Sequence, residues 1–397
     1  MKDTVGNLYV LVAARDNAEV TRRFVAYEEV KTVLASGETR SSVVLRCGMQ
    51  VDLRVVAPES FGAALVYFTG SKAHNIALRR IAQSRGLKIN EYGVFTGAER
   101  IAGNTEESVY QSIGLAWVPP ELREDRGEVE AARTGHLPAL IELGDLRGDL
   151  HAHTKATDGH DSLRDMTLAA RQCGLSYLAI TEHSQRLAMA HGFDAVRIAK
   201  RIDEIDRLNA VLDGITLLKG VEVDILEDGG LDLPDSILAR LDIVVGAIHS
   251  RFDLPRAKQT ERVLRAMDHP YFSMLAHPTG RLIGEREPYD IDLLRVIRKA
   301  RERGCFLELN VHPKRLDLLD YLLSDGQRRG RSGRDQFGCS QSSGVREPAL
   351  RNRTGTSRLA GKSRRAQYEI ARAVATPARA HALRYGADMI TGGHRDV

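Results

Sequence analysis

Between residues 148 and 320 the chain repeats one pattern, in which a short apolar run ends in a residue able to bind a metal ion. Successive end points lie 27 to 39 residues apart, which is the length of a strand followed by a helix. Because parallel strands have their carboxyl ends at the same edge, these polar residues are predicted to converge on one site. The end points are His151, His183, Glu222, His249, His277 and Asn310, with His312 just beyond the last.

The segments between these runs have the periodicity of amphipathic helices. In AVRIAKRIDEIDRL, Ile198, Ile202 and Ile205 recur at helical spacing, while charged residues occupy most other positions. Buried strands alternating with such helices predict an α/β fold with a parallel barrel or sheet. One histidine at a strand end is more often a satisfied core residue, but the repeated set predicts a centre with several metal ions.

The stretch GDLHAHTKATDGH opens this region. Residues i and i+2 of a strand face the same side, so His151 and His153 are placed to reach one metal ion. Asp158 on the following loop can reach that ion or a second one. An HxH pair near a turn is weak evidence by itself, because two exposed histidines give the same pattern. The repeated strand ends favour the metal interpretation.

Composition excludes several classes of protein. At 397 residues with 43% hydrophobic content, the chain is long enough for two or three globular domains. Its apolar runs are shorter than the roughly 18 residues that span a membrane, and the start MKDTVGNLYVLVA lacks a secretory signal. A cytoplasmic protein with no membrane partner is therefore expected. The four cysteines show no CxxC spacing, so neither a disulfide framework nor a cysteine zinc site is predicted.

Residues 148 to about 320 resemble the PHP (polymerase and histidinol phosphatase) domain, through the histidine motifs just described. The resemblance implies a distorted seven-stranded barrel, (βα)7, around up to three ions of Zn²⁺ or Mn²⁺, and the hydrolysis of phosphoesters. It implies that Glu222 bridges ions, and that Arg281 in HPTGRL contacts a phosphate unless it forms a structural salt bridge. The implied ligand pairs are His151 with His153, Asp158 with His183, and His249 with His277.

The segment ahead of this domain resembles the thumb of family X DNA polymerases. The match runs through VYFTGSKAHNIALRRIAQSRGLKINEYGVF at residues 66–95. Before it, SSVVLRCGMQVDLRVV alternates like a strand hairpin and presents Asp52 at the position of a catalytic carboxylate of that family's palm. After it, WVPPELREDRGEVEAA at residues 117–132 resembles the linker between thumb and PHP domain. The residues implied to bind DNA or nucleotide are Tyr67, Phe68, Gly70, Asn75 and Arg79.

The chain as a whole resembles a bacterial family X DNA polymerase with a C-terminal PHP domain. The expected fold class is α/β, in which the distorted (βα)7 PHP barrel is preceded by a partial α+β palm and thumb. The family's preceding DNA-binding and finger domains are expected to be missing. The expected domains are a partial palm at 1–60, a thumb at 61–116, a linker at 117–147, the PHP domain at 148–320 and a basic tail at 321–397.

The palm departs from the family pattern at the residues that bind Mg²⁺. Its first strand, VGNLYVLVA, has Asn7 and Tyr9 where the family has two aspartates. Asparagine is a poorer Mg²⁺ ligand, and the phenol of tyrosine stays protonated near neutral pH. Asp52 alone cannot hold two divalent ions, so the palm is expected to have lost its Mg²⁺ site and its polymerase activity.

The tail is the second departure. Residues 321–397 carry 14 arginines and one lysine against six acidic residues, although the whole chain is only +4. The family's last barrel strand, which ends in Asp-Ala-His, is not found there. Codons for Gly333 to Gln341 read from their second base can encode Val-Val-Ile-Ser-Ser-Asp-Ala-His, so a frameshift near Asp320 is one hypothesis. A basic DNA-binding arm is the alternative. With a frameshift, the barrel is expected to lack a strand, bind fewer metals and have impaired activity.

Three classes of function remain open. The first is a DNA-repair enzyme whose PHP domain is a 3′–5′ exonuclease or processes 3′ ends, on gapped or primer–template DNA and without an obligate protein partner. The second is a histidinol-phosphatase-like enzyme for a small phosphomonoester, which has no reason to carry the thumb motif. The third is a non-catalytic DNA-binding remnant, which the altered palm and tail favour. The thumb motif favours the first class.

Overall fold

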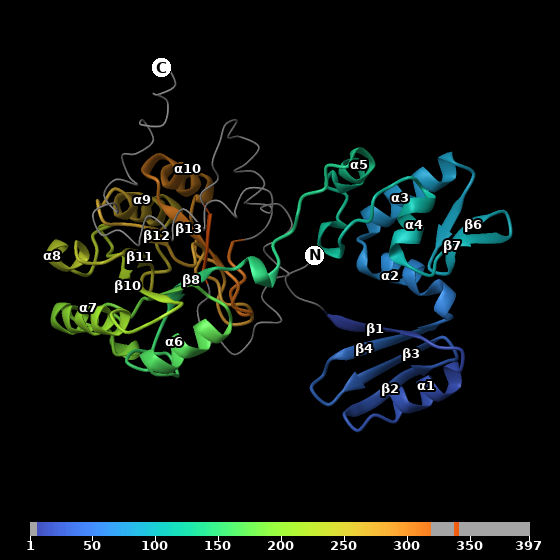
Figure 1. Ribbon diagram of the computed structural model, residues 1–397, viewed down its shortest axis with the longest axis horizontal. Coiled ribbons are helices and arrows are strands. Elements are labelled where there is room, and N and C mark those ends of the chain that lie inside the picture. The colour runs from blue at the N-terminus through green and yellow to red at the C-terminus, as the bar shows by residue number, and fades with distance from the viewer. Residues whose placement is uncertain (1–5, 319–336, 341–397) are drawn as a thin grey trace, which may run out of the picture. The chain divides into compact units, whose positions relative to one another are not determined.

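The computed structural model describes residues 6–318 and 337–340 (Figure 1). The chain divides into two compact units, Met1–Pro138 and Ala139–Val397, which are described separately. The domain limits expected from the sequence stay a prediction. Within the described residues, none of the helices has the length and apolar character needed to cross a membrane.

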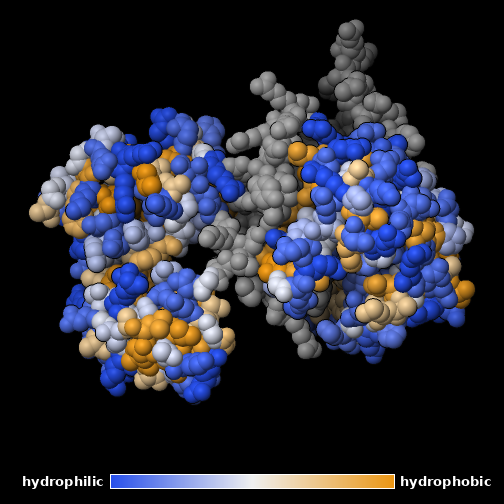
Figure 2. Space-filling model, turned by 180° about the vertical axis from the view of Figure 1, so that it is seen from behind, coloured by the Kyte–Doolittle hydropathy of each residue, from blue (hydrophilic) through white to orange (hydrophobic). Residues whose placement is uncertain are grey.

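A four-stranded sheet with the order β1-β4-β3-β2 begins the first unit. Its middle strands form the hairpin expected around Asp52, and their turn places Gly48 at φ +86°, a conformation that favours glycine. β1 pairs in parallel with β4 and sets Tyr9 opposite Asp52. The outer strands expose large hydrophobic side chains, and Figure 2 shows apolar surface on this part of the chain. The elements are β1 (Asn7–Ala13), α1 (Asn17–Val25), β2 (Val30–Ser36), β3 (Arg40–Leu45) and β4 (Gln50–Val56).

The rest of this unit consists of helices around a small antiparallel sheet, β5-β6-β7. Ser71 caps α3, because its hydroxyl accepts a hydrogen bond from the backbone N–H of His74. α2 passes close to the start of α4, where a Cβ on Gly62 would lie 2.1 Å from the backbone of Thr105. The elements are α2 (Phe61–Thr69), α3 (Lys72–Ser84), β5 (Lys88–Asn90), β6 (Gly93–Thr96), β7 (Glu99–Ala102), α4 (Glu106–Ser112) and α5 (Glu128–Thr134), with short 3-10 turns at Pro58–Ser60 and Pro120–Leu122.

A curled parallel sheet surrounded by helices forms the second unit (Figure 1). Its strands follow the order β14-β13-β12-β11-β10-β9-β8, and all adjacent pairs are parallel. β14 also contacts β8, so the two outer strands meet. This confirms the α/β fold class and the PHP-like barrel. The strands are β8 (Gly148–Ala152), β9 (Tyr177–Ile180), β10 (Thr216–Asp224), β11 (Ile243–Ala247), β12 (Met274–Leu275), β13 (Phe306–Asn310) and β14 (Phe337–Ser340).

The helices of this unit bury apolar stripes against the strands. Ile198 and Ile202 of α7 pack with Val221 and Val223 of β10, and Ile205 is buried in the adjoining cluster. The prediction of an amphipathic helix here is confirmed. The helices are α6 (Leu163–Gln172), α7 (Ala195–Asn209), α8 (Asp235–Leu238), α9 (Arg256–Met267) and α10 (Leu293–Arg303), with 3-10 turns at Leu143–Asp145 and Ala188–Ala190.

β14 lies in the tail, where no barrel strand was expected from the sequence. That expectation is wrong for residues 337–340, whose backbone pairs in parallel with β13 between Leu307 and Asn310. The physical reason is that an open strand edge presents unpaired N–H and C=O groups, which another extended segment can satisfy through its own backbone. The other tail residues that bear on the frameshift hypothesis, 319–336 and 341–397, lie outside the described residues.

Candidate metal centre

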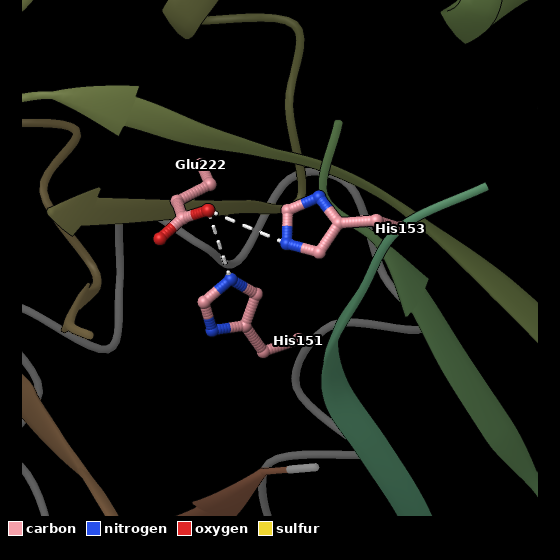
Figure 3. Close-up of side chains that lie close together, drawn as sticks. All are labelled: His151, His153 and Glu222. Carbon is pink, nitrogen blue, oxygen red and sulfur yellow. Dashed lines mark ion pairs between the residues drawn. The ribbon is translucent and has the colours of Figure 1, made fainter. Parts of the chain in front are cut away.

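The carboxylate of Glu222 lies among imidazoles at the carboxyl end of the barrel. Glu222 is in β10 and is 1% exposed. His151 and His153 come from the end of β8, and Figure 3 shows both rings directed at one Glu222 oxygen. The Nε2 atom of each histidine lies 3.3 Å from Glu222 Oε2. The structure therefore brings this pair together on one side of the strand, as the HxH spacing predicts.

Three further histidines approach the same carboxylate from the next strand ends. His183 follows β9, and its Nδ1 lies 2.9 Å from Glu222 Oε2. His249 and His277 follow β11 and β12, and their Nε2 atoms lie 3.4 and 2.9 Å from Glu222 Oε1. Five strands thus each deliver a ligand-type side chain to one point.

Asp158 lies on the loop after β8 and completes the group. Its Oδ2 lies 3.1 Å from Nε2 of His183, and its Oδ1 lies 3.6 Å from Nδ1 of His153. The loop folds tightly, because a Cβ on Gly159 would lie 2.1 Å from the carbonyl oxygen of His153. The Asp158 side chain is 49% exposed, so this carboxylate marks the open side of the centre.

Two buried acidic residues beside the centre were not singled out from the sequence. Glu308 in β13 is fully buried; its Oε1 lies 2.8 Å from Nδ1 of His151, and its Oε2 accepts the backbone N–H of His277. Asp224, two residues after Glu222 on the same strand face, has an oxygen 3.4 Å from Nδ1 of His249. The two-residue strand period places Asp224 on the strand face of Glu222 and Glu308 on that of Asn310, which is the signal in the sequence that points to both residues.

The charges of the centre shift the pKa values of its members. Burial opposes protonation of His151, but the carboxylates of Glu222 and Glu308 outweigh burial and raise its pKa well above the usual value. Burial opposes ionisation of Glu222, but His151, His183 and His249 outweigh it and hold its pKa well below the usual value. Glu222 is therefore a carboxylate anion at neutral pH.

The donor set fits metal ions. Several buried ring nitrogens make no hydrogen bond within the described part of the chain, and a buried polar atom without a partner is costly. Imidazole nitrogens mixed with carboxylate oxygens are ligands that Zn²⁺ and Mn²⁺ accept. The nitrogens concerned are Nε2 of His151 and Nδ1 of His153, His183, His249 and His277. The groups whose ligand atoms lie mutually within 4.8 Å are His151–His153–Glu222, His153–Asp158–His183 and His183–Glu222–His249.

Arg281 lies beyond the centre, in the loop after β12. Its Nε donates a hydrogen bond to the backbone oxygen of Arg315 at 2.7 Å, and its Nη2 donates to that of Leu316. These bonds tie the loop after β12 to the loop after β13. The role of Arg281 as a phosphate contact stays a prediction.

The predicted DNA-binding residues of the thumb lie together at the junction of α2 and α3. Asn75 Nδ2 donates hydrogen bonds to the backbone oxygens of Tyr67 at 2.9 Å and Gly70 at 3.2 Å, which braces the turn. The rings of Tyr67 and Phe68 meet edge to face with centroids 5.0 Å apart. The guanidinium of Arg79 lies 5.6 Å from the centre of the Tyr67 ring. Their role in binding DNA stays a prediction.

A buried hydrogen-bonded network holds the segment after the thumb on these helices. His74 Nδ1 lies 2.6 Å from Glu128 Oε1, and His74 Nε2 lies 2.9 Å from the hydroxyl of Tyr110. Glu128 also accepts the backbone N–H groups of Asp125 and Arg126. Burial opposes ionisation of Glu128, but these hydrogen bonds outweigh it and lower its pKa.

The palm carboxylate Asp52 does not fit a divalent ion. It is 2% exposed, and neutral side chains already donate to both of its oxygens. Asn7 Nδ2 donates to Oδ2 at 2.7 Å, the Ser42 hydroxyl donates to Oδ1, and Gln50 Nε2 reaches both at 3.2 and 3.3 Å. Burial opposes ionisation, but these hydrogen bonds lower the Asp52 pKa. Tyr9 opposite it is 57% exposed and adds no carboxylate.

Comparison with known proteins agrees with both halves of this description. The family model for the DNA polymerase beta thumb matches residues 64–124, and the model for the PHP domain matches residues 149–312. A DNA polymerase/3′-5′ exonuclease PolX from Bacillus subtilis (strain 168) is 43% identical over 333 residues. The chain belongs to the family X DNA polymerases that carry a PHP domain. The alignment covers 83% of this chain and 58% of the length of the Bacillus protein.

Other relatives match a shorter stretch of this chain. A probable phosphatase from Acetivibrio thermocellus is 33% identical over 172 residues, which are 41% of this chain and 65% of that protein. A probable phosphatase from Thermoanaerobacter sp. (strain X514) is 31% identical over 168 residues, 41% of this chain and 63% of that protein. Each of these matches is about as long as the match to the PHP family model.

Proposed function

We propose that this chain is a metal-dependent phosphoesterase that removes nucleotides from DNA 3′ ends, as a 3′–5′ exonuclease. The observation that carries the proposal is the set of five imidazoles around the Glu222 carboxylate at one end of the barrel. The name of the Bacillus relative includes a 3′-5′ exonuclease, and the matched thumb supports a DNA substrate. Gapped or primer–template DNA in the bacterial cytoplasm is the expected substrate, which implies a role in repair.

We assign up to three ions, of Zn²⁺ or Mn²⁺, to this centre. Glu222 would help to hold more than one ion, because each of its oxygens faces more than one imidazole. Bound ions of this kind make hydroxide available near neutral pH and stabilise the oxygens of a phosphate undergoing displacement. The assigned ligand pairs are His151 with His153, Asp158 with His183, and His249 with His277.

The chain's own residues hold these donors in place and define the entrance. Glu308 holds the ring of His151 by a hydrogen bond to Nδ1 of that ring, which leaves Nε2 of His151 directed at the centre. Asp224 Oδ1 lies 3.4 Å from Nδ1 of His249 and accepts a hydrogen bond from the backbone N–H of His249 at 3.3 Å. The buried strand ends exclude bulk water on the barrel side, while the half-exposed Asp158 leaves the substrate side open.

We infer that the palm does not extend DNA. Polymerisation in this fold needs carboxylates that share two divalent ions, and Asn7 and Tyr9 supply none. The hydrogen bonds from Asn7, Ser42 and Gln50 instead satisfy Asp52 within the protein. Primer extension in Mg²⁺ or Mn²⁺ above background would contradict this inference.

A small phosphomonoester is the second candidate substrate. The similarity to two probable phosphatases favours it, because each match is about as long as the PHP domain of this chain. The thumb match favours DNA, since a phosphatase for a small metabolite gains nothing from a DNA-binding turn.

A nuclease assay on the full chain separates these candidates. The substrate is a 5′-labelled primer with an unpaired 3′ end on a template, and p-nitrophenyl phosphate serves as the small phosphomonoester. With Mn²⁺ or Zn²⁺, the primer should shorten one nucleotide at a time, and a chelator should stop the reaction.

Two matched variants complete the test. His153→Ala should abolish shortening because it removes a proposed ligand, whereas His160→Ala should not, because His160 is an exposed histidine of the same loop. A ladder that persists in His153→Ala would refute the assignment of the centre. Turnover of the phosphomonoester alone would replace DNA with the second candidate substrate.

A further inference from the structure

Several hydrogen bonds anchor the backbone of the loop after β13, which carries Arg315. Asn310 and Asp317 pair across its base, and the backbone N–H of Arg315 donates to the oxygen of His312 at 2.8 Å. Arg281 binds the backbone oxygen of Arg315 from the neighbouring loop. Because β13 is parallel to its neighbours, this loop leaves the barrel at the end that carries the metal centre.

The guanidinium of Arg315 has an unsatisfied donor. Its Nη1 is shielded from solvent and makes no hydrogen bond to the described residues, which also provide no carboxylate within ion-pair distance. A buried charged donor without a partner is unfavourable, because it has lost its water and gained nothing in exchange. A backbone fixed by several hydrogen bonds that carries an unsatisfied guanidinium is the arrangement expected for a ligand contact.

Further positive charge lies beside Arg315. Arg286 is held by a hydrogen bond from its Nε to the oxygen of Gly280 at 2.9 Å, and its guanidinium lies 4.1 Å from the centre of the Phe252 ring. The loop of Arg286 is joined to the residue before Arg315, because the backbone N–H of Leu282 donates to the oxygen of Arg286 at 2.8 Å and that of Ile283 donates to the oxygen of Lys314 at 2.6 Å. Two guanidinium groups therefore share this part of the structure.

Hydrogen bonds place this loop next to the candidate metal centre. Both the backbone N–H and the hydroxyl of Thr279, two residues after His277, donate to Asp317 Oδ2 at 2.8 Å, and Asp317 is two residues after Arg315. Glu285 pairs with Lys314, and Asp317 Oδ1 makes no hydrogen bond to the described residues. The guanidinium groups of Arg281, Arg286 and Arg315 and the carboxylate of Asp317 therefore share two adjoining loops beside the proposed ligands.

We propose that Arg315, supported by Arg286, binds a phosphate group of the substrate beside the metal centre, while Arg281 holds the loop rather than the substrate. The inference rests on the proposed function of that centre. A guanidinium suits this ligand because its planar N–H groups match two phosphate oxygens at once. The phosphate belongs either to the backbone of a DNA strand or to a small phosphomonoester, and the experiment distinguishes these sources.

The test compares Arg315→Gln and Arg315→Lys with Arg295→Ala in the full chain. Arg295 is the control because it is an exposed arginine on α10, with its Nη2 3.8 Å from Glu261 Oε2. Binding of a fluorescent single-stranded oligonucleotide is measured by anisotropy at several salt concentrations, and inorganic phosphate is the competitor. Circular dichroism and zinc content establish that each variant is folded and keeps its metal.

Arg315→Gln is expected to weaken oligonucleotide binding about tenfold and to lower the slope of log K against log salt by about one. Arg315→Lys should recover part of the binding, and Arg295→Ala should not change it. Weaker competition by phosphate with unchanged oligonucleotide binding would instead identify a small phosphomonoester site.

Unchanged binding of both ligands in folded, metal-loaded Arg315→Gln would overturn the proposal. If Arg315→Gln unfolds, Arg315→Lys decides, because it keeps the charge but loses the paired geometry and should still bind several-fold more weakly. If the proposed function is wrong, the result looks different. The parent chain then shows no nuclease activity, while the differences in binding between the variants remain.

Discussion

Replacing Glu308 with glutamine should weaken metal binding, although Glu308 is not one of the proposed metal ligands. The carboxylate of Glu308 is fully buried and holds two groups at once, Nδ1 of His151 at 2.8 Å and the backbone N–H of His277. Glutamine keeps the volume but presents an amide N–H to one of these two donors. At least one hydrogen bond is lost, and the anion that increases the basicity of His151 is removed.

The magnitude follows from the nature of the lost contact. A hydrogen bond to a charged group contributes about 1.5–3 kcal/mol. Loss of the carboxylate behind a metal-binding histidine typically lowers metal affinity about 10- to 100-fold, which is the same range. Glu308→Gln should therefore bind Zn²⁺ roughly 10 to 100 times more weakly than the parent chain.

Competition with a chromophoric chelator measures this affinity directly. Glu302→Gln is the matched control, because Glu302 lies on α10 with an exposed side chain whose Oε1 lies 3.8 Å from Nζ of Lys299. An unchanged zinc affinity in folded Glu308→Gln would refute the role assigned to Glu308. Equal losses in both variants would refute it too, since they would show a general effect of charge.

Three further substitutions test other parts of the account. Asn7→Asp should destabilise the first unit by about 1–3 kcal/mol, because it replaces the donor to Asp52 with a second carboxylate; Asn90→Asp, which keeps an acceptor for Tyr92 N–H, is the control in chemical unfolding. Folding lowers the pKa of Glu128, so its carboxylate stabilises the folded state above pH 4.5, and this stabilisation is lost as the pH falls through the lower folded pKa. Glu128→Gln should therefore make the folded state less sensitive to acid in a circular dichroism titration. An unchanged titration would contradict the network. Gly246→Ala places a Cβ 2.1 Å from the Phe272 ring and should cost about 1–3 kcal/mol, whereas Gly144→Ala, with open space around it, should cost little in the same thermal melt.

The metal centre is the part of the structure that the sequence predicts best. His183, His249 and His277 each end an apolar run, and parallel strands place such ends together whatever the details of packing. Glu222 could be recognised in the same way, although its central position among the rings could not. That position depends on the curvature of the sheet, which no local pattern encodes.

The supporting residues show where sequence reasoning stops. Glu308 and His151 are 157 residues apart, and they meet only because the outer strands of the sheet meet. Asn310 was singled out instead of Glu308, but its Oδ1 accepts the backbone N–H of His312 and so shapes the turn. Both residues share one face of β13, so the two-residue period did not decide between them.

The palm and the tail also contain contacts that the sequence did not predict. The sequence led to the prediction that Asn7 and Tyr9 stand where the family has carboxylates, whereas the hydrogen bonds that satisfy Asp52 required the pairing of β3 with β4. In the tail, side-chain composition argued against a barrel strand, yet residues 337–340 pair with β13. Backbone pairing depends on an available edge as well as on side chains.

The central claim is that Glu222 and the five imidazoles around it bind metal ions, and anomalous diffraction tests it most directly. Crystals of the full chain grown with Zn²⁺ would be measured at the zinc absorption edge. The account predicts anomalous peaks about 2.0–2.2 Å from Glu222 oxygens and from nitrogens of His151, His153 and His183. Absence of any peak there, with Glu222 accepting hydrogen bonds directly from the imidazoles, would contradict it.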